Sequence, residues 1–240
     1  MRILVVNDDG IKAEGIIRLA RAAQTFGEVW VVAPKHQCSA MSSRITLRGE
    51  IAVEREEFPV EDITAYSVDG TPADCVKIAL TELMPEKPDI VFSGINHGFN
   101  AGIDIQYSGT VGAAMEALLN GIPAIAFSSE VHGSVEVVEE YLVPIAEELL
   151  KKPLPANEIW NVNFPGCALA ELKGVRRDCE PAQTPFYRDH FQSVRESERG
   201  FVVSAAGIPV TTPFPAETDA YAIQNGYISV GTIRSMILVP

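Results

Sequence analysis

The first 34 residues alternate between apolar runs and helical periodicity, and this alternation constrains the fold more than any other feature. Residues 2–6 and 28–34 are short, β-branched apolar runs of the kind that form strands buried on both faces. Between them, apolar residues recur at helical spacing from Ile16 to Phe26, and Gly27 stands where a helix would stop. This order predicts a right-handed crossover between two parallel strands.

The same alternation continues to about residue 165. Residues 45–57 alternate between apolar and polar, and predict two antiparallel strands that turn at Arg48-Gly49-Glu50. The other expected elements are strands at 65–68, 87–93, 124–129 and 158–165 and helices at 71–84, 111–119 and 135–152. We therefore expect an α/β fold, a Rossmann-like, doubly wound and mostly parallel sheet, over residues 1–165.

Beyond residue 165 the regular alternation of strand and helix ends. Residues 174–210 have little helical periodicity and predict strands and loops, whereas Thr218 begins a short helix and residues 227–230 form a strand. We interpret residues 166–240 as a C-terminal extension, packed on the same domain and used as an oligomerisation arm.

Composition excludes several classes of protein. The formal net charge of −13 argues against binding to a nucleic acid polymer or to an anionic membrane surface, since both need a basic face. No apolar stretch reaches the roughly 18 residues of a membrane span, and the first apolar run is too short for a signal peptide. The four cysteines form no metal-binding or redox motif. A cytoplasmic protein with reduced thiols is the expectation.

Two adjacent carboxylates, Asp8 and Asp9, directly follow the first strand. The carboxyl edge of a parallel sheet is where ligands bind. Two neighbouring negative charges are costly unless a positive partner joins them, and a divalent cation is the simplest one. The alternative is that the pair only caps the first helix, with Gly10 making the turn.

Other polar loops leave the same edge of the predicted sheet. Residues 35–43 carry several hydroxyls, and residues 94–102 carry Asn96 and Asn100, whose amide oxygens suit a hard cation. The turn Ser108-Gly109-Thr110 precedes a helix, so its free amides and the helix dipole suit a phosphate. Its alternative reading is a simple helix cap.

Five motifs together resemble the SurE survival-protein family, and the family's pattern returns at Thr218-Asp219 and at residues 226–230. They lie in the family's order and spacing over the first 130 residues. The motifs are Asn7-Asp8-Asp9-Gly10, the loop at 33–39, Asp69-Gly70-Thr71-Pro72-Ala73-Asp74-Cys75-Val76, Ser93-Gly94-Ile95-Asn96 with Gly98 and Asn100, and Tyr107-Ser108-Gly109-Thr110-Val111.

The resemblance implies a metal-dependent phosphatase that hydrolyses nucleoside 5'-monophosphates, with 3'-monophosphates and short polyphosphate as further candidate substrates. It implies one divalent cation per subunit, Mg²⁺ or Mn²⁺, and a homodimer or homotetramer that exchanges C-terminal segments. Asp8 and Asp9 would be catalytic. The implied metal ligands are Asp8, Asp9, Ser39 and Asn96, and the implied phosphate-binding residues are Asn96, Gly98, Ser108, Gly109 and Thr110.

The segment from Thr184 to Arg199 departs from the family's pattern, which leaves nucleotide preference and oligomer contacts open. The main alternative function is a non-catalytic nucleotide-binding or regulatory protein that uses the same site. A phosphorylatable signalling domain is disfavoured, because the middle strand ends in Ser93-Gly94 where that fold needs an aspartate.

Overall fold

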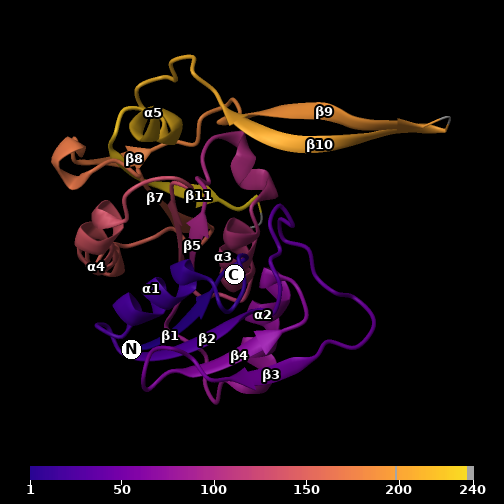
Figure 1. The fold of residues 1–240 in the computed structure, drawn as a ribbon. Coiled ribbons are helices and arrows are strands. Elements are labelled where there is room, and N and C mark those ends of the chain that lie inside the picture. The colour runs from indigo at the N-terminus through magenta and orange to yellow at the C-terminus, as the bar shows by residue number, and fades with distance from the viewer. Residues whose placement is uncertain (198, 237–240) are drawn as a thin grey trace.

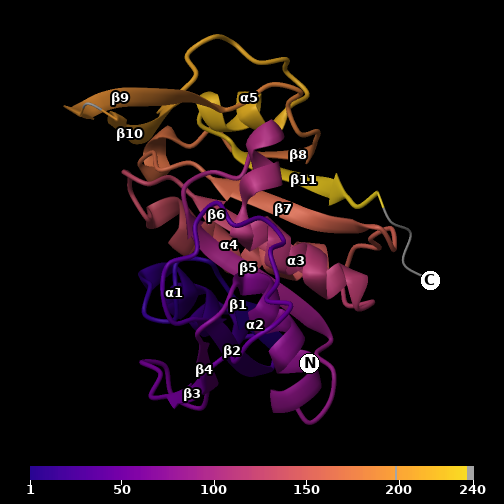
Figure 2. The same ribbon diagram turned by 90° about the vertical axis from the view of Figure 1, so that its right-hand side faces the viewer.

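The computed structural model describes residues 1–197 and 199–236, and its centre is one mostly parallel sheet (Figures 1 and 2). The spatial order of its strands is β3 (Val53–Glu56), β4 (Thr64–Val68), β2 (Glu28–Pro34), β1 (Arg2–Val6), β5 (Ile90–His97), β6 (Ala124–Ser129), β7 (Glu158–Phe164), β11 (Ile228–Arg234) and β8 (Val175–Cys179). From β4 to β7 in this order all neighbouring strands are parallel, whereas β3 runs antiparallel to β4 and β11 runs antiparallel to β7.

The sheet is wound in two directions from its middle. From β1 the chain moves outward to β2 and β4, and it then returns to pair β5 with the other side of β1 before adding β6 and β7. The order therefore reverses between β1 and β5, where Val6 pairs with Ser93. Ligands of open α/β sheets bind at this switch point, outside the carboxyl ends of the strands. The predicted doubly wound α/β fold is confirmed.

Helices cover both faces of the sheet. Because side chains alternate along a strand, Ile3 and Val5 pack with α1 and α4, whereas Leu4 and Val6 pack with α2 and α3. Among the residues described, none of the helices has the length and apolar character needed to cross a membrane. The helices are α1 (Glu14–Ala23), α2 (Pro72–Ile78), α3 (Gly109–Leu119), α4 (Glu136–Leu150) and α5 (Asp219–Gln224), with shorter turns at Ala79–Leu83, Ile103–Tyr107 and Leu169–Glu171.

One expected hairpin is wrong. Of the two strands predicted within 45–57, only β3 forms, and residues 45–52 run irregularly around the edge of α2. The backbone groups that a hairpin ladder would use are bonded elsewhere: the amide of Thr46 donates to the Asp74 carboxylate, and the carbonyl of Arg44 accepts from the Thr71 hydroxyl. Leu47 gains no burial and is 82% exposed.

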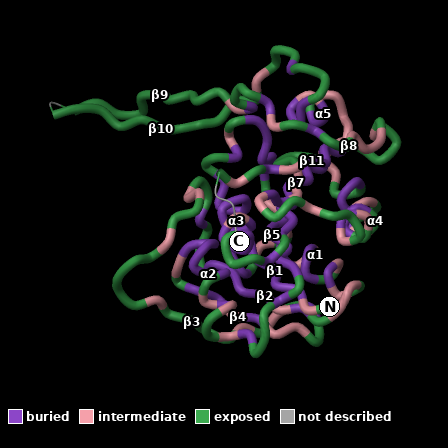
Figure 3. The backbone as a smooth tube through the Cα atoms, turned by 180° about the vertical axis from the view of Figure 1, so that it is seen from behind, coloured by how far each residue is buried: buried purple, intermediate pink, exposed green. Residues whose placement is uncertain are grey.

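The C-terminal extension contributes two strands to the main sheet and one isolated hairpin. β11 lies between β7 and β8 and so continues the sheet. By contrast, β9 (Tyr187–Ser197) and β10 (Gly200–Pro209) form a two-stranded ribbon that projects from the body and is exposed along its length beyond Tyr187 (Figures 1 and 3). Within the predicted segments Thr184–Arg199 and 166–240, residue 198 and residues 237–240 lie outside the described residues.

Asp219 joins the extension to the loop after β5. Thr218 caps α5 as predicted, and its hydroxyl accepts from the amide of Tyr221. The neighbouring Asp219 carboxylate is buried and accepts backbone amides from Gly102 at 3.1 Å and from Ala182 at 3.0 Å. Burial raises the pKa of this carboxyl, and the amide bonds oppose that shift. The loop after β5 is thereby fixed from the C-terminal side.

We predict that Gly15→Ala lowers the free energy of unfolding by about 1–3 kcal/mol, because a Cβ there would lie 2.1 Å from the carbonyl oxygen of Ile95. Helix propensity alone would favour alanine by up to about 1 kcal/mol. Urea denaturation would measure the change. Ala22→Gly in the same helix calibrates the propensity term, and a Gly15→Ala protein as stable as the parent would contradict the close packing of α1 on β5.

Candidate metal and phosphate site

The turn after β1 presents Asp8 and Asp9 without using either as a helix cap. Asn7 closes the turn: its Nδ2 donates to the carbonyl of Gly10 at 3.0 Å, and its Oδ1 accepts from the Gly10 amide at 3.2 Å. Helix α1 begins later, with Ala13 at the N-cap position and no side-chain cap. The interpretation of the acidic pair as a cap is therefore wrong.

Asp8 is buried against the start of α3. Only 3% of it is exposed, and its Oδ1 accepts a hydrogen bond from Thr110 Oγ1 at 2.7 Å. A Cβ on Gly109 would lie 2.8 Å from the Asp8 Cβ, so only glycine allows this approach. Burial, and secondarily the Asp9 charge, raise the pKa of Asp8 to about 6 against the opposing Thr110 bond.

Asp9 lies beside Asp8 and is more accessible. Its Oδ2 accepts the backbone amide of His97 at 3.0 Å, and its Oδ1 accepts from Gln37 Nε2 at 3.3 Å. The same Gln37 nitrogen donates to Ser39 Oγ at 3.0 Å. Asp9 therefore holds the end of β5 and the loop after β2 in place, and the Ser39 hydroxyl lies one hydrogen-bonded side chain away.

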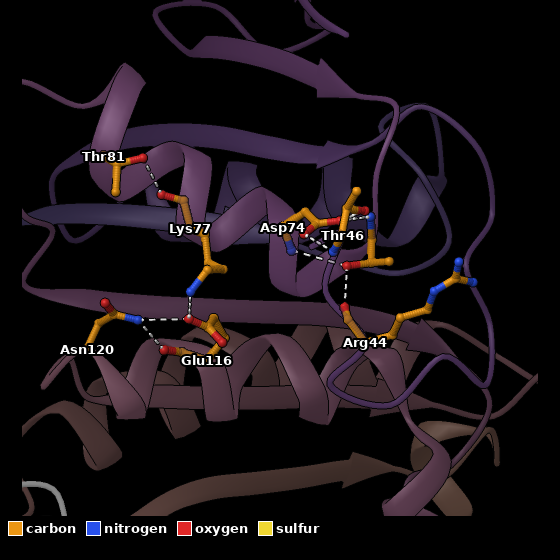
Figure 4. A network of polar contacts seen from close by, with 8 residues as sticks. Arg44, Thr46, Asp74, Lys77, Thr81, Glu116 and Asn120 are labelled. Carbon is orange, nitrogen blue, oxygen red and sulfur yellow. Dashed lines mark hydrogen bonds and ion pairs between the residues drawn. The ribbon is translucent and has the colours of Figure 1, made fainter. Parts of the chain in front are cut away.

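The loop that carries Ser39 is anchored at both ends. At the near end, the amide of Cys38 donates to the carbonyl of Asp8 at 2.7 Å. At the far end, the Asp74 carboxylate on α2 accepts both the amide and the hydroxyl of Thr46, each at 2.8 Å (Figure 4). The Asp74 side chain also accepts from the Thr71 amide, which completes the capping box of α2.

β5 supplies Asn96 from within the sheet. The strand was expected to end at residue 93, but it continues to His97 past an irregularity after Ser93, and Asn96 pairs with Ser128. Asn96 Nδ2 donates to the carbonyl of Gly98 at 2.8 Å. This bond orients the amide, and among the described residues its Oδ1 has no protein donor, so that oxygen is available to a cation.

Asn100, the second candidate oxygen donor, uses its backbone carbonyl and its side-chain nitrogen in hydrogen bonds that hold the fold together. Its carbonyl accepts from Asn161 and Asn163 on β7, and its Nδ2 donates to Ser128 Oγ at 2.7 Å. The asparagines of β7 therefore reach the same sheet edge, and they hold the loop after β5 in place.

A cavity of about 320 Å³ joins the β1 turn to the start of α3. Asp9 borders a second cavity of about 430 Å³, and His97 lines both. Ser108 caps α3 through Val111, so the cap reading of that turn holds, but Ser108 also lines the first cavity. Of the sequence-predicted site residues, the first cavity is lined by Asp8, Ser39, Asn96, Gly98, Asn100 and Ser108.

Gly109 and Thr110 stand behind this cavity. Gly109 contacts Asp8, and Thr110 is fully buried with its hydroxyl engaged by the same carboxylate. The structure thus brings seven of the eight sequence-predicted metal and phosphate positions together at or directly behind this cavity, while Asp9 faces the neighbouring cavity.

The donor set fits a hard divalent cation. Neither Asp8 nor Asp9 forms an ion pair with a basic side chain in the described part of the chain, so the acidic pair lacks a protein counter-charge. Among those residues there is also no group of three or more His, Cys, Asp or Glu side chains that could hold a metal. Two carboxylates with hydroxyl and amide oxygens, from Ser39 and Asn96, match Mg²⁺ or Mn²⁺ chemistry.

Sequence reasoning did not identify Asp104 and Tyr187, which also line the first cavity. Tyr187 is 56 or more residues from every other lining position except Gly207, so no local pattern indicates it. The structure places it there because the Asp104 carboxylate accepts the Tyr187 amide at 2.8 Å.

We expect Asp8→Asn to raise the free energy of unfolding of metal-free protein at pH 7.5 by about 1–3 kcal/mol. Folding raises the pKa of Asp8 to about 6. Above this pKa the buried carboxylate is ionised and lowers the free energy of unfolding, and the penalty fades as the pH falls toward the pKa of the unfolded chain. The gain should therefore disappear near pH 4. Denaturant titrations at both pH values would measure it, and equal stability of the two proteins at pH 7.5 would contradict the burial argument.

We expect Thr110→Val to weaken Mn²⁺ binding and to move its pH midpoint upward by about one unit, because the variant loses a hydrogen bond to the ionised carboxylate. Isothermal titration calorimetry at several pH values would measure both effects. Thr81→Val is the matched control, since the Thr81 hydroxyl bonds to the Lys77 carbonyl on an exposed face of the helix (Figure 4). If Thr81→Val weakened Mn²⁺ binding to the same extent, general destabilisation would explain the effect and not the lost bond to Asp8.

Comparisons with known proteins agree with this site. A family model described as survival protein SurE matches residues 3–187. The chain is 40% identical over 235 residues to the 5'-nucleotidase SurE of Flavobacterium psychrophilum, an alignment that covers 97% of this chain and 91% of that protein. It is 39% identical over 243 residues to the 5'-nucleotidase SurE of Halorhodospira halophila, covering 98% of this chain and 92% of that protein.

The fold also matches a solved structure. The SurE protein from Aquifex aeolicus superposes with a TM-score of 0.82 at 33% sequence identity, covering 99% of this chain and 95% of that one. With a sheet whose switch point carries the acidic pair and with relatives aligned over almost their whole length, the chain belongs to the SurE survival-protein family.

Proposed function

We propose that this chain is a 5'-nucleotidase, a metal-dependent phosphatase that converts nucleoside 5'-monophosphates into nucleoside and phosphate. One observation carries the proposal: a single cavity joins the buried Asp8 to Ser108 at the amino end of α3. Such a cavity combines oxygen ligands for a cation with a helix start that favours an anion. The names of the relatives support the same activity.

Asp8, Asp9, Ser39 and Asn96 would hold one divalent cation per subunit, Mg²⁺ or Mn²⁺. When bound, the cation supplies positive charge that neutralises phosphoryl oxygens and lowers the pKa of water. The electrostatics of the chain support this assignment, because a phosphate monoester would otherwise meet two carboxylates with no basic side chain paired to them in the described residues.

The phosphate would lie between Asn96, Gly98 and the start of α3. Gly98 has φ +129°, a backbone conformation that glycine adopts readily, and the nearest atom to a Cβ there would be 3.6 Å away. Gly109 and Ser108 contribute the amino end of an 11-residue helix, whose dipole favours negative charge. Thr110 acts through Asp8, since its side chain is fully buried.

The environments of the two aspartates differ, and we assign them different roles. Asp8 is fixed by Thr110 and nearly inaccessible, which suits a permanent ligand. Asp9 is partly exposed and borders the second cavity, and its only side-chain donor at hydrogen-bond distance among the described residues is Gln37. Asp9 is therefore the group that accepts a proton from an attacking water.

We further propose that the protein acts in the cytoplasm as a homodimer or homotetramer, with the extension 166–240 as its oligomerisation arm. The ribbon of β9 and β10 supports this assignment, because it exposes apolar side chains that the other described residues leave uncovered. The largest are Phe191 at 61% and Phe201 at 72% exposed. A reducing compartment would keep the four cysteines as the free thiols that they form here.

Metal-stripped protein should release inorganic phosphate from nucleoside 5'-monophosphates only after Mn²⁺ or Mg²⁺ is added back. Asp9→Asn should reduce that release by a factor of about 100 or more, because it removes both a charged ligand and the proton acceptor. Phosphate release from a panel of nucleoside monophosphates would measure both effects and rank the substrates, including 3'-monophosphates and short polyphosphate.

Asp62→Asn makes the same charge change at an exposed turn and serves as the control. Unchanged phosphate release by Asp9→Asn, with weakened metal binding, would refute the catalytic assignment. A parent protein that binds nucleotide and releases no phosphate with any metal would instead support the alternative function, a non-catalytic nucleotide-binding protein.

A further inference from the structure

The second cavity belongs to a different part of the fold from the first. Its volume is about 430 Å³, and it lies between the amino ends of α1 and α4 and the loop after β6. Among the described residues, none from α3 or from the β9–β10 ribbon lines it. Asp9 borders this cavity and Asp8 borders the first, while His97 and Val131 line both. The two cavities are therefore neighbours that meet at the end of β5.

The walls of the second cavity are fixed by contacts within the chain. The Glu130 carboxylate accepts the amide of Gly166 at 2.8 Å, and the amide of Ser134 donates to the carbonyl of Gly166, also at 2.8 Å. These bonds hold the loop after β6. Arg18 forms an ion pair with Glu139, which joins α1 to α4. The cavity therefore has its shape before any ligand binds, which lowers the cost of binding.

Much of the lining is apolar, and the cavity is larger than water requires. Ala13, Ile95 and the buried Val138 contribute to it, and Val131 and Val135 remain 38% and 47% exposed. One water molecule takes up roughly 30 Å³ of the liquid. Sites for small organic molecules typically measure about 300–1,000 Å³. The second cavity accordingly has the size and the lining of a site for a small organic molecule.

The proton acceptor of the proposed reaction faces this cavity and not the first. Asp9 borders the second cavity, whereas the residues around the phosphate position, Asn96 and Ser108, line the first. A general base must lie within hydrogen-bond reach of the nucleophile whose proton it accepts. The attacking water therefore approaches from the side of the second cavity, where a hydroxyl group of a bound organic molecule would have the same access to Asp9.

We propose that the second cavity is an acceptor site, in which the hydroxyl of a small primary alcohol replaces the attacking water. The inference rests on the proposed function and adds phosphoryl transfer to hydrolysis. The bond between phosphorus and the nucleoside oxygen breaks, and a bond between phosphorus and the alcohol oxygen forms. Asp9 receives the proton of the alcohol and later returns it to the solvent, while the departing nucleoside oxygen takes up a proton from water. One phosphate monoester is thereby converted into another, with no change of oxidation state.

The charges around the cavity determine which alcohols fit. Three carboxylates line it, those of Asp9, Glu14 and Glu130. The one guanidinium in the lining, that of Arg18, is already paired with Glu139. This negative field favours an acceptor with a positive group and opposes one with a negative group. The acceptor class is therefore a short amino alcohol or neutral alcohol with an apolar body, and a hydroxy acid is excluded.

The test follows phosphoryl transfer from adenosine 5'-monophosphate by phosphorus NMR, which resolves an alkyl phosphate from inorganic phosphate. Parent protein supplied with Mn²⁺ should transfer to 4-amino-1-butanol and to 1-butanol, with product formation reaching a plateau as the alcohol concentration rises. Methanol at equal concentration should give at least about five-fold less product, because each buried methylene adds favourable transfer free energy. The anion 4-hydroxybutanoate should give at least about five-fold less than the amino alcohol, because like charges repel.

Val135→Trp tests whether the alkyl phosphate forms in the second cavity. The larger side chain at the amino end of α4 should lower transfer by about five-fold or more, since it fills the space of the alcohol. Phosphate release without alcohol should stay within about two-fold of the parent. Val53→Trp makes the same change at a valine that is 37% exposed on β3, the edge strand, and should alter neither rate.

Two results would overturn the acceptor site while the phosphatase assignment stands. One is phosphate release with no alkyl phosphate from any alcohol. The other is equal transfer to methanol, 1-butanol and 4-hydroxybutanoate, which would mean that alcohol only replaces solvent water. The comparison of alcohols uses the parent protein, so it decides the question even if Val135→Trp does not fold.

A binding experiment separates the acceptor site from the proposed function. If the parent forms neither phosphate nor alkyl phosphate, the proposed function fails, and equilibrium dialysis of 4-amino-1-butanol then tests the cavity by itself. Binding to the parent that is at least about five-fold weaker in Val135→Trp would support the alcohol site. Equal binding to both proteins, or none to the parent, would overturn it.

Discussion

The site depends on one close contact, between the Asp8 carboxylate and the first turn of α3. Glycine at position 109 allows α3 to approach Asp8 closely, and the Thr110 hydroxyl donates a hydrogen bond to the buried Asp8 carboxylate. Burying a charge without a basic partner is costly, and the raised pKa of Asp8 expresses that cost. The arrangement is stable enough only because the rest of the domain fixes both β1 and α3, and it leaves a strong field for a cation to neutralise.

Everything else around the site positions loops relative to that contact. The order of strands reverses between β1 and β5, so the turn carrying Asp8 and the strand carrying Asn96 are neighbours. Asp9 then bonds the end of β5 and, through Gln37, the loop with Ser39. The residues of the site come from separate segments, but hydrogen bonds between those segments make them one rigid unit.

Local periodicity was sufficient to predict most of the fold. The apolar runs and capping residues indicated the strands and helices of the core, and the polar loops after them indicated the site, because parallel strands end at one edge. The strands within 45–57 failed because Asp74, almost thirty residues away, competes for the backbone groups around Thr46. Tyr187 was missed for a similar reason: its place depends on Asp104, a contact between distant segments that no sequence window contains.

The position of β11 has a consequence for the order in which the chain assembles. β11 lies between β7 and β8, and in the described residues β8 joins the sheet only through β11. A ribosome delivers β8 first, but its place stays out of reach until residues 228–234 emerge and pair with β7. Until then β7 presents an open edge, the kind of surface on which nascent chains associate. The order of strands in space therefore makes the pairing of β11 with β7 a precondition for adding β8 to the sheet.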